Sequence, residues 1–440
     1  MKSSLKAALN SVTGWFSTGA PEEQIDPAYV VLFLEQKAKA GDAQAQFNLG
    51  ALFDAVKQNY EEAAKWYRRA ADQNYADAQQ QLGFCYSNGH GVKLDYAEAV
   101  KWHRRAADQN HANAQHDVGV CYAKGQGVEK DYTEAVGWFR KAAEQNLPEA
   151  QHNLGVFYKN GTGVERDYAE AVRWFRMAAE QNSALAQDTL GVCYANGQGV
   201  EMDYAKAVKW YRMAAEQNLA AAQHNLAFCY KHGQGVEKDC VTAVKWYRMA
   251  AEQNHAPAQS NLGLCYCNGE GVEKDSTEAV HWYRMAAEQN NADAQFNLGL
   301  SYAVGQGVEK DYAEAVRWFR KAAAQGDASA QYNLGHFYAN GQGIEQDHAE
   351  AFNWYRKAAE QNHPSAQTNL GFCYANGESV EQDYSEAYAW YNLAAVSFAL
   401  AAENRDSLES MMTPKQVSDA QKRTKELREQ IAARLKGRSK

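Results

Sequence analysis

Apolar residues recur along the chain at helical spacing, in short stretches separated by polar turns. Residues 150–185 show this pattern clearly. The first half of the segment places five residues on one face of a helix: Ala150, Leu154, Phe157, Tyr158 and Gly161. The second half does the same with another five: Ala171, Trp174, Phe175, Ala178 and Ala179. The spacing predicts two amphipathic helices that pack against each other.

The dipeptide Ala-Gln marks the start of each copy of this pattern. Its alanines are Ala45, Ala78, Ala114, Ala150, Ala186, Ala222, Ala258, Ala294, Ala330 and Ala366. Every step between them is 36 residues, except the first, which is 33. A length of 440 residues alone would suggest two or three domains. The regular period instead predicts one all-α solenoid of stacked antiparallel helix pairs.

A Gly-x-Gly turn joins the two predicted helices of each unit. It occurs eight times in register, from Gly89 to Gly343, and a ninth unit has Ser379 in place of its second glycine. Such loops can bind phosphate, but a dinucleotide-binding fold needs a preceding strand, and none is predicted here. We expect the first glycine to end a helix in the left-handed conformation and the second to let the chain fold into the next helix.

The second helix of each unit is expected to begin at a capping box. In Asp167-Tyr-Ala-Glu170, the aspartate can accept from first-turn amides and the glutamate can reach back to the cap. Two units have Lys206 and Thr242 at the glutamate position. The full pair recurs at Asp95/Glu98, Asp131/Glu134, Asp275/Glu278, Asp311/Glu314, Asp347/Glu350 and Asp383/Glu386.

Most of the cysteines occupy one slot of the repeat. These are Cys85, Cys121, Cys193, Cys229, Cys265 and Cys373. The slot holds Phe157, Ser301 and Phe337 in other units, and only Cys240 and Cys267 lie outside it. Cysteines that share one register do not come in pairs. We therefore expect free, buried thiols that act as small apolar residues, which suits a reducing compartment.

Charge and hydropathy restrict the possible partners and the compartment. The formal net charge of −9 and the pI of about 5.8 argue against a nucleic-acid partner. The longest apolar run, residues 28–34, is too short for a membrane span. Polar residues interrupt residues 1–25, so we expect an uncleaved N-terminal extension, with a cleaved signal peptide as the alternative. The expected compartment is the cytoplasm, and the alternative is a secreted or host-delivered protein.

The repeated residues resemble the Sel-one-like repeat family, relatives of the tetratricopeptide repeats. The family pattern is A-x-x-L-G-x-x-Y-x-x-G-x-G-V-x-x-D-x-x-x-A-x-x-W-Y-x-x-A-A. Residues 45–401 are similar to it almost unit by unit, over ten tandem repeats of about 36 residues. The departures are few: Val118, Ala227, Cys240, Ser276 and His348. The resemblance implies a right-handed superhelix that scaffolds other proteins. Members of the family serve as adaptors in membrane-associated degradation, bacterial envelope assembly, signalling and host interaction.

Both ends of the array also fit this family. Residues 26–44 are expected to form a capping half-repeat, because Asp26 aligns with the capping aspartate and Phe33 with the tryptophan slot. Residues 402–440 are expected to form C-terminal capping helices with a basic end, and they are similar to the closing segment of bacterial members. Thr413 and Pro414 are a strong helix start, since proline is well placed in a first turn.

No arrangement of catalytic or metal-ligating residues is evident. His116, His152 and His224 share one repeat position, but stacked helices lie about 8–10 Å apart, too far for their rings to share a metal easily. We expect these histidines to be solvated or to face a partner. Some cysteine-rich relatives are described as weak β-lactamases, but their paired cysteines are missing here. We therefore expect no cofactor, no metal and no enzymatic activity. The repeated tryptophans, from Trp66 to Trp390, are expected in the core.

One face of the first helix is the candidate binding surface. Counting each Ala-Gln alanine as zero, positions 0, 4, 7 and 8 form the core face, at about 100° per residue. Positions 2, 3, 6, 9 and 10 lie on the opposite side. Position 2 varies widely: Phe47, Gln80, His116, His152, Asp188, His224, Ser260, Phe296, Tyr332 and Thr368. Position 3 barely varies: Asn48, Gln81, Asp117, Asn153, Thr189, Asn225, Asn261, Asn297, Asn333 and Asn369. Position 6 is mostly apolar, as at Phe84, Phe228 and Leu264.

In tetratricopeptide relatives this face lines a concave groove, where matching asparagines bind peptide main chain. An amide offers donors and an acceptor, so it can pair with a peptide of any sequence. The resemblance thus implies binding residues at Asn48, Asn153, Asn225, Asn261, Asn297, Asn333, Asn369, His116, His152, His224, Phe296 and Tyr332. The alternative is that the asparagines satisfy polar groups within the array.

Two functions therefore remain open. The favoured one is a protein-interaction scaffold whose groove takes an extended segment of a partner protein. The alternative is an architectural or self-assembling rod that uses its ends or its convex face. A hydrolase of β-lactamase type is a distant third.

Overall fold

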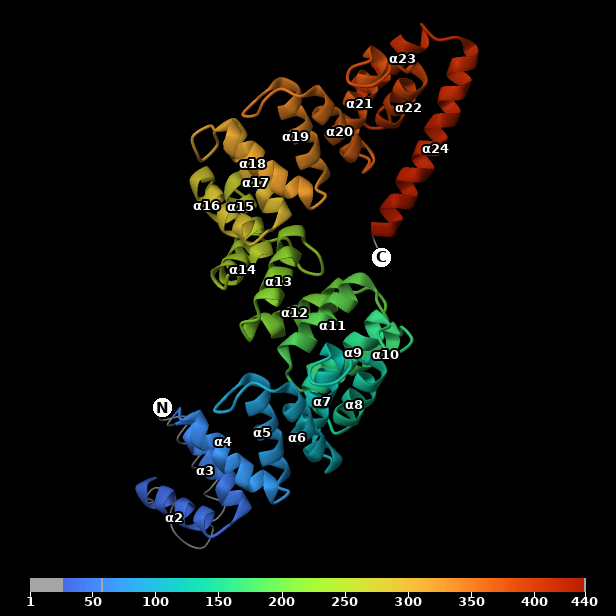
Figure 1. Cartoon of the computed structure of the whole chain (residues 1–440). Helices are drawn as coiled ribbons and strands as arrows, with labels where there is room; N and C mark the ends of the chain where they lie inside the picture. Colours follow the sequence, from blue (N-terminus) through green and yellow to red (C-terminus); the bar gives the residue numbers. More distant parts are fainter. Residues whose placement is uncertain (1–26, 57, 439–440) are drawn as a thin grey trace. The chain divides into compact units, whose positions relative to one another are not determined.

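The computed structural model describes residues 27–56 and 58–438, and these form helices with no strand (Figure 1). The predicted all-α solenoid of stacked helix pairs is confirmed. The chain divides into two compact units, one ending at Gln217 and the other beginning at Asn218. The expected N-terminal extension and the cap at Asp26 lie outside the described residues.

The first unit holds five helix pairs preceded by a single helix, α2, which packs against α3. First helices carry odd numbers and second helices even numbers. The bounds are α2 Pro27–Lys39, α3 Ala43–Ala55, α4 Tyr60–Asp72, α5 Ala76–Asn88, α6 Tyr96–Asp108, α7 Ala112–Lys124, α8 Tyr132–Glu144, α9 Pro148–Asn160, α10 Tyr168–Glu180, α11 Ala184–Asn196 and α12 Tyr204–Glu216.

The second unit holds another five pairs, followed by two further helices. The bounds are α13 Ala220–His232, α14 Cys240–Glu252, α15 Ala256–Asn268, α16 Ser276–Glu288, α17 Ala292–Val304, α18 Tyr312–Ala324, α19 Ala328–Asn340, α20 His348–Ala359, α21 Pro364–Asn376, α22 Tyr384–Ala394, α23 Ala399–Glu409 and α24 Pro414–Arg438. Helix α24 begins at Pro414, as the sequence predicts, and packs along α22. Ion pairs join Arg423 to Glu386 and Arg434 to Glu360.

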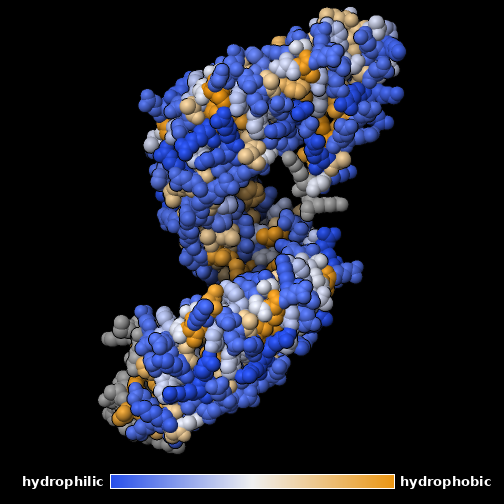
Figure 2. Space-filling model, in the orientation of Figure 1, coloured by the Kyte–Doolittle hydropathy of each residue, from blue (hydrophilic) through white to orange (hydrophobic). Residues whose placement is uncertain are grey.

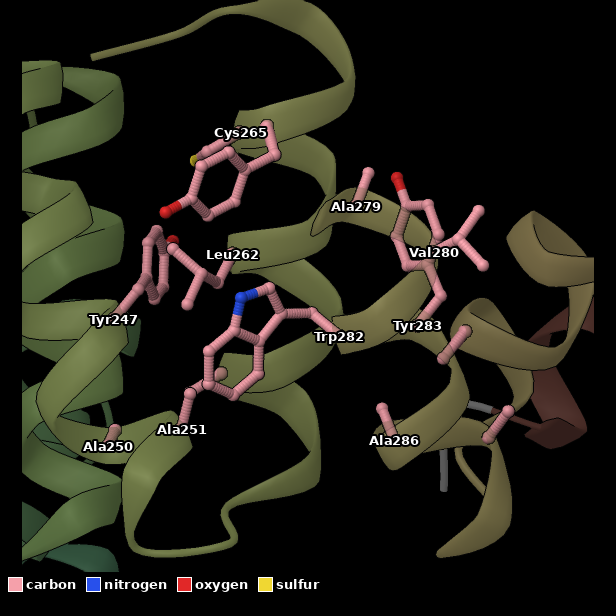
Figure 3. Packing of buried hydrophobic residues seen from close by; sticks show 14 of the residues in the cluster. Tyr247, Ala250, Ala251, Leu262, Cys265, Ala279, Val280, Trp282, Tyr283 and Ala286 are labelled. Atoms are coloured by element: carbon pink, nitrogen blue, oxygen red, sulfur yellow. The ribbon is translucent and has the colours of Figure 1, made fainter. Parts of the chain in front are cut away.

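The core of each unit lies between successive helix pairs. Figure 3 shows Leu262 and Cys265 of α15 facing Tyr247 of α14, with Trp282 of α16 beside them. All four side chains are buried. The predicted core position of the tryptophans is confirmed, since six are buried and four are half-buried. Repeat packing thus uses the apolar faces that the sequence pattern predicts.

The cysteine slot is buried, as predicted. All six of its cysteines are at most 6% exposed. Burial raises the pKa of the Cys121, Cys229 and Cys265 thiols to about 11. Cys240 and Cys267, outside the slot, are only half-buried, so the expectation that every thiol is buried is wrong for these two. All eight are free thiols in the structure.

A ladder of buried glutamine side chains links the helices, and the sequence analysis missed it. The glutamine of each Ala-Gln is at most 5% exposed. Gln79 Nε2 donates to the Ala71 carbonyl at the end of α4, 3.2 Å away, and to Asn74 Oδ1. Its Oε1 accepts from Gln109 Nε2 at the end of α6, at 2.7 Å. Gln79 therefore joins three helices and bonds to a carbonyl at the end of one of them. Within the described residues, the last glutamine of the ladder, Gln367, lacks the bond to its Oε1 because Ser397 stands where a glutamine would donate it.

The Gly-x-Gly turn has the predicted left-handed first glycine, and its second glycine also lies against the preceding repeat. The first glycine, for example Gly125, ends its helix in the left-handed conformation at φ 70°. The second, Gly127, also has a positive φ, of 73°. A Cβ added there would lie 2.1 Å from the Tyr96 carbonyl oxygen, at the start of the preceding second helix. The second glycine is therefore required by contact between repeats as well as by its backbone conformation.

Half of the predicted capping box is confirmed. Asp167 Oδ1 accepts from the Ala169 and Glu170 amides, at 2.9 and 3.0 Å. The expected return bond from the glutamate is wrong, because the Asp167 N–H donates to the Tyr158 carbonyl of α9, 3.0 Å away. That carbonyl lies near the end of its helix and lacks a helical partner. Glu170 is thus free to pair with Arg173 at 2.6 Å.

Candidate protein-binding groove

A groove of about 620 Å³ lies on the predicted face of the second unit. It crosses α13, α15 and α17 and reaches the start of α19, so it spans the first helices of four successive repeats. Its lining residues are His224, Phe228, Pro257, Ser260, Asn261, Leu264, Asn291, Asp293, Phe296, Asn297, Asp327 and Ser329. Figure 2 shows that the visible surface of the molecule is mostly hydrophilic, with apolar residues in small patches. A groove that combines aromatic and amide side chains therefore stands out as a binding surface.

Four of the predicted binding residues meet in this groove. His224, Asn261, Phe296 and Asn297 come from three successive first helices. Asn261 Nδ2 donates to His224 Nε2, 3.0 Å away in the preceding repeat. The Asn297 side chain forms no hydrogen bond within the part of the chain that the structure describes, so its whole amide is available to a ligand.

His224 is half-buried, and neighbouring side chains hold its ring in place. Its ring packs against Tyr247, with centroids 5.7 Å apart, and against His255 at 5.3 Å. Burial and the neighbouring His255 lower its pKa to about 4. His224 is therefore neutral at pH 7. Its Nδ1 lies 3.3 Å from Asn225 Oδ1, which places the proton on Nδ1 and leaves Nε2 to accept from Asn261.

The equivalent residues of the first unit form a similar chain. His116 accepts from Asn153 at 2.9 Å and packs on the Phe139 ring. His152 packs on Phe175 and lies 3.3 Å from Thr189 Oγ1. These histidines are half-buried, and each packs beside an aromatic ring of its own second helix. Side chains at positions 2 and 3 of the first helices therefore also form hydrogen bonds between successive repeats. The expected contact of these histidines with a partner stays a prediction.

Two successive repeats of the first unit replace these positions by a titratable pair. His103 stands where other second helices have Tyr or Phe, and Asp117 stands in the asparagine row. Their Nδ1 and Oδ2 atoms are 3.6 Å apart, and His103 is 3% exposed. Burial lowers the pKa of His103. Burial alone would raise the pKa of Asp117, but hydrogen bonds and charge from His116, His103 and Gln80 lower it.

The remaining predicted residues occupy several environments. Asn48 is buried, and its Nδ2 has no hydrogen-bond partner in the described structure. Asn225 contacts His224 within its own helix, and Asn333 Nδ2 donates to the Ser329 carbonyl at 2.8 Å. Asn369 forms a hydrogen bond with the Tyr355 hydroxyl. Tyr332 stacks on His363, with centroids 4.9 Å apart. These residues lie outside the groove of the second unit, except for His224 and Ser329, which line it.

Two aspartates also line the groove, and the sequence pattern did not point to them. Asp293 lies in the first turn of α17, and Asp327 caps α19 by accepting from the Ala330 amide at 2.6 Å. Burial, opposed by that hydrogen bond and aided by the charge of Asp293, raises the pKa of Asp327. Both positions vary between repeats, and only the stacking of α17 on α19 brings them together.

A family model described as Sel1 repeat matches ten consecutive segments, from 43–75 to 364–395. The chain belongs to the Sel1 repeat family. This is the family that the sequence resembles. The Sel1 units begin two residues before each Ala-Gln, so they coincide with the helix pairs described above.

Solved Sel1 structures are similar to most of the chain. One is c5321, a protective antigen present in uropathogenic Escherichia coli strains, with 36% identity and a TM-score of 0.81 over 99% of this chain and 93% of that one. Another is a Sel1 repeat protein from Oxalobacter formigenes, with 33% identity and a TM-score of 0.54 over 74% of this chain and 99% of that one. Chitin synthase regulatory factor 4 of Schizosaccharomyces pombe is 33% identical over 72 residues, which span 16% of this chain and 11% of that protein.

Residues 27–56 and 58–438 contain neither a metal-binding cluster nor a membrane-spanning helix. No group of three or more His, Cys, Asp or Glu side chains in that part of the chain is placed to hold a metal ion. No helix there is long and apolar enough to cross a membrane.

Proposed function

We propose that this Sel1 repeat protein is an interaction scaffold that binds an extended segment of a partner protein in the groove of its second unit. Sel1 repeat solenoids are generally protein-interaction scaffolds, which supports the class of function. The observation that carries the groove is the open amide of Asn297 beside Phe296 and the partly exposed Phe228, which is 40% exposed. The main chain of the partner segment forms hydrogen bonds with the asparagine amides, and its apolar side chains pack on the phenylalanine rings.

The dimensions of the groove suit an extended peptide. Four neighbouring first helices span about three interhelix steps, or about 25–30 Å at 8–10 Å per step. An extended chain rises about 3.3 Å per residue, so the groove matches a segment of about eight residues. The two phenylalanines lie on α13 and α17, two repeats apart, so they can hold side chains at separate points of the segment.

The architectural alternative receives less support. Its most basic candidate surface is the C-terminal helix, but two of that helix's arginines, Arg423 and Arg434, are paired with glutamates of the last repeats. These ion pairs hold α24 against the array. Enzymatic activity forms no part of the proposal.

The compartment remains part of the proposal. Buried thiols of raised pKa fit a reducing cytoplasm. The secreted or host-delivered alternative gains some support from c5321, since that protein is a protective antigen.

Selection from a random library of capped octapeptides tests the proposed function. The full chain is expected to enrich a set of peptides, and the double variant Phe228→Ala/Asn297→Ala is expected to lose them. The control is Phe372→Ala, which removes a 52% exposed ring at the same repeat position outside the groove and should keep them. Failure of the chain to bind any peptide, or equal loss in the control, would contradict the proposal.

A further inference from the structure

The groove of the second unit carries acidic side chains and, among the described residues, no lysine or arginine. Of its twelve lining residues, two are aspartates and none is lysine or arginine. Neither Asp293 nor Asp327 forms an ion pair with a lysine or arginine among the described residues. The groups whose charge acts on Asp327 are Asp293 and His363. His224 is neutral at pH 7, and burial lowers the pKa of His363, whose charge would otherwise offset Asp327.

The two carboxylates sit at one end of the groove, beside its apolar part. They belong to the N-terminal ends of α17 and α19, whereas Phe228 and Leu264 lie in the later turns of α13 and α15. One oxygen of Asp327 is used by the helix cap. Burial and the charge of Asp293 raise the pKa of Asp327, and no lysine or arginine of the described chain lines the groove to offset them.

We infer that the segment bound in the groove carries a lysine or arginine whose cationic head lies between Asp293 and Asp327, with apolar side chains toward Phe228 and Leu264. This inference rests on the proposed function and specifies the chemistry of its partner. A cation at that place relieves the repulsion between the two aspartates and forms charge-assisted hydrogen bonds in a partly buried site. An acidic segment is disfavoured there for the same reason.

The alternative is that both aspartates only stabilise the N-terminal ends of α17 and α19. Negative side chains are favourable in a first turn, and aspartate is a common cap. Asparagine also caps helices well, so replacing Asp327 by asparagine keeps the cap while removing the charge. Asp293 is not a cap residue, so Asp293→Asn alone serves as a second variant if the double variant is unstable.

The experiment measures binding of a positional-scanning library of capped octapeptides, in which each position is fixed in turn. The wild-type chain is expected to favour lysine or arginine over glutamine at one position by about tenfold to a hundredfold, the effect of one charge-assisted hydrogen bond. Asp293→Asn/Asp327→Asn should abolish this preference while apolar preferences persist. The charge-matched control is Glu309→Gln/Glu345→Gln, which changes two exposed loop residues outside the groove and should keep it.

The outcomes separate this inference from the proposed function. Peptides that bind without preference for a cation, or that keep the preference in the aspartate variants, overturn the inference and leave the scaffold intact. A chain that binds none of the peptides overturns both. Thermal melting of each variant shows whether any loss of binding comes from unfolding, and Asp293→Asn decides the question if the double variant melts early.

Discussion

Asn261 donates its side-chain amide to the unprotonated Nε2 of His224, 3.0 Å away on the first helix of the preceding repeat. The bond requires a neutral imidazole, because a protonated ring has no acceptor. It joins the variable and the near-constant rows of the groove face. The same relationship recurs between Asn153 and His116 in the first unit. Binding and repeat packing therefore share residues on this face.

Protonation of His224 is expected to destabilise the fold in acid. The pKa of this side chain is about 4 in the folded chain, against an ordinary value of 6.5. Above pH 6.5 neither state is protonated and the group contributes nothing. As pH falls from 6.5 to 4, the unfolded state takes up a proton first, so the free energy of unfolding decreases, by at most about 3 kcal/mol at 1.36 kcal/mol per unit.

Urea unfolding between pH 4 and 8 measures this effect. His224→Gln should flatten the pH dependence, since glutamine occupies the same repeat position at Gln80. His281→Gln is the control, because His281 is exposed on α16 and should leave the slope unchanged. If wild type and His224→Gln lose stability equally as the pH falls, the lowered pKa of His224 is contradicted.

The glutamine ladder is expected to contribute strongly to stability. Gln151 is fully buried and donates to the Ala143 carbonyl at 3.2 Å, while its Oε1 accepts from Gln181 at 2.8 Å. Gln151→Ala leaves buried polar groups unpaired and should cost about 2–4 kcal/mol of unfolding free energy. Gln198→Ala, in a turn, should change it by less than about 0.5 kcal/mol. Similar small effects at both sites in urea unfolding would show that the ladder is incidental.

Three glycines separate backbone conformation from contact between repeats. Gly89→Ala carries only the cost of the left-handed conformation, about 1–2 kcal/mol, because an added Cβ there would lie 3.7 Å from the nearest heavy atom. Gly127→Ala carries that cost and a Cβ 2.1 Å from the Tyr96 carbonyl oxygen, so it should be the most destabilising. Gly137 lies in α8 with nothing within 4 Å of an added Cβ, and Gly137→Ala should stabilise by up to about 1 kcal/mol. Chemical denaturation should give this order, and a reversal of the first two would be evidence against the contact.

Thiol accessibility is expected to divide the cysteines into two classes. In native protein, a thiol reagent should react quickly at Cys240 and Cys267 only, because the other six thiols are buried and burial raises their pKa. In denaturant without reductant, all eight should react. Fewer than eight would reveal disulfides and favour an oxidising compartment.

Features that depend on spacing within one repeat could be predicted from the sequence. The helix pairs, the Asp167 type of cap and the left-handed Gly125 follow from local pattern and backbone preference. The buried cysteine slot follows from its register. Each of these needs no knowledge of how one repeat meets the next.

Features that depend on stacking could not be predicted in the same way. The Asp167 N–H pairs with the Tyr158 carbonyl of another helix instead of with Glu170, and the ring of His224 packs against Tyr247. Gln79 gave a signal, since glutamine follows the alanine in every unit, but a polar residue beside the core face has no evident partner until repeats are stacked. Asp293 and Asp327 gave only a weak signal, because aspartate recurs at each of these repeat positions just once more, at Asp77 and Asp42.

The most direct test of the groove is the single variant Asn297→Ala, with melting temperature and affinity for a selected octapeptide measured on the same samples. Asn297 has no side-chain hydrogen bond within the described residues and lines the groove. Melting should therefore stay within about 1 °C of wild type or rise slightly, since alanine favours helix. Affinity should fall about twofold to twelvefold, the loss of one neutral hydrogen bond of about 0.5–1.5 kcal/mol. An unchanged affinity together with a lower melting temperature would show that the asparagine row is structural and would contradict the groove.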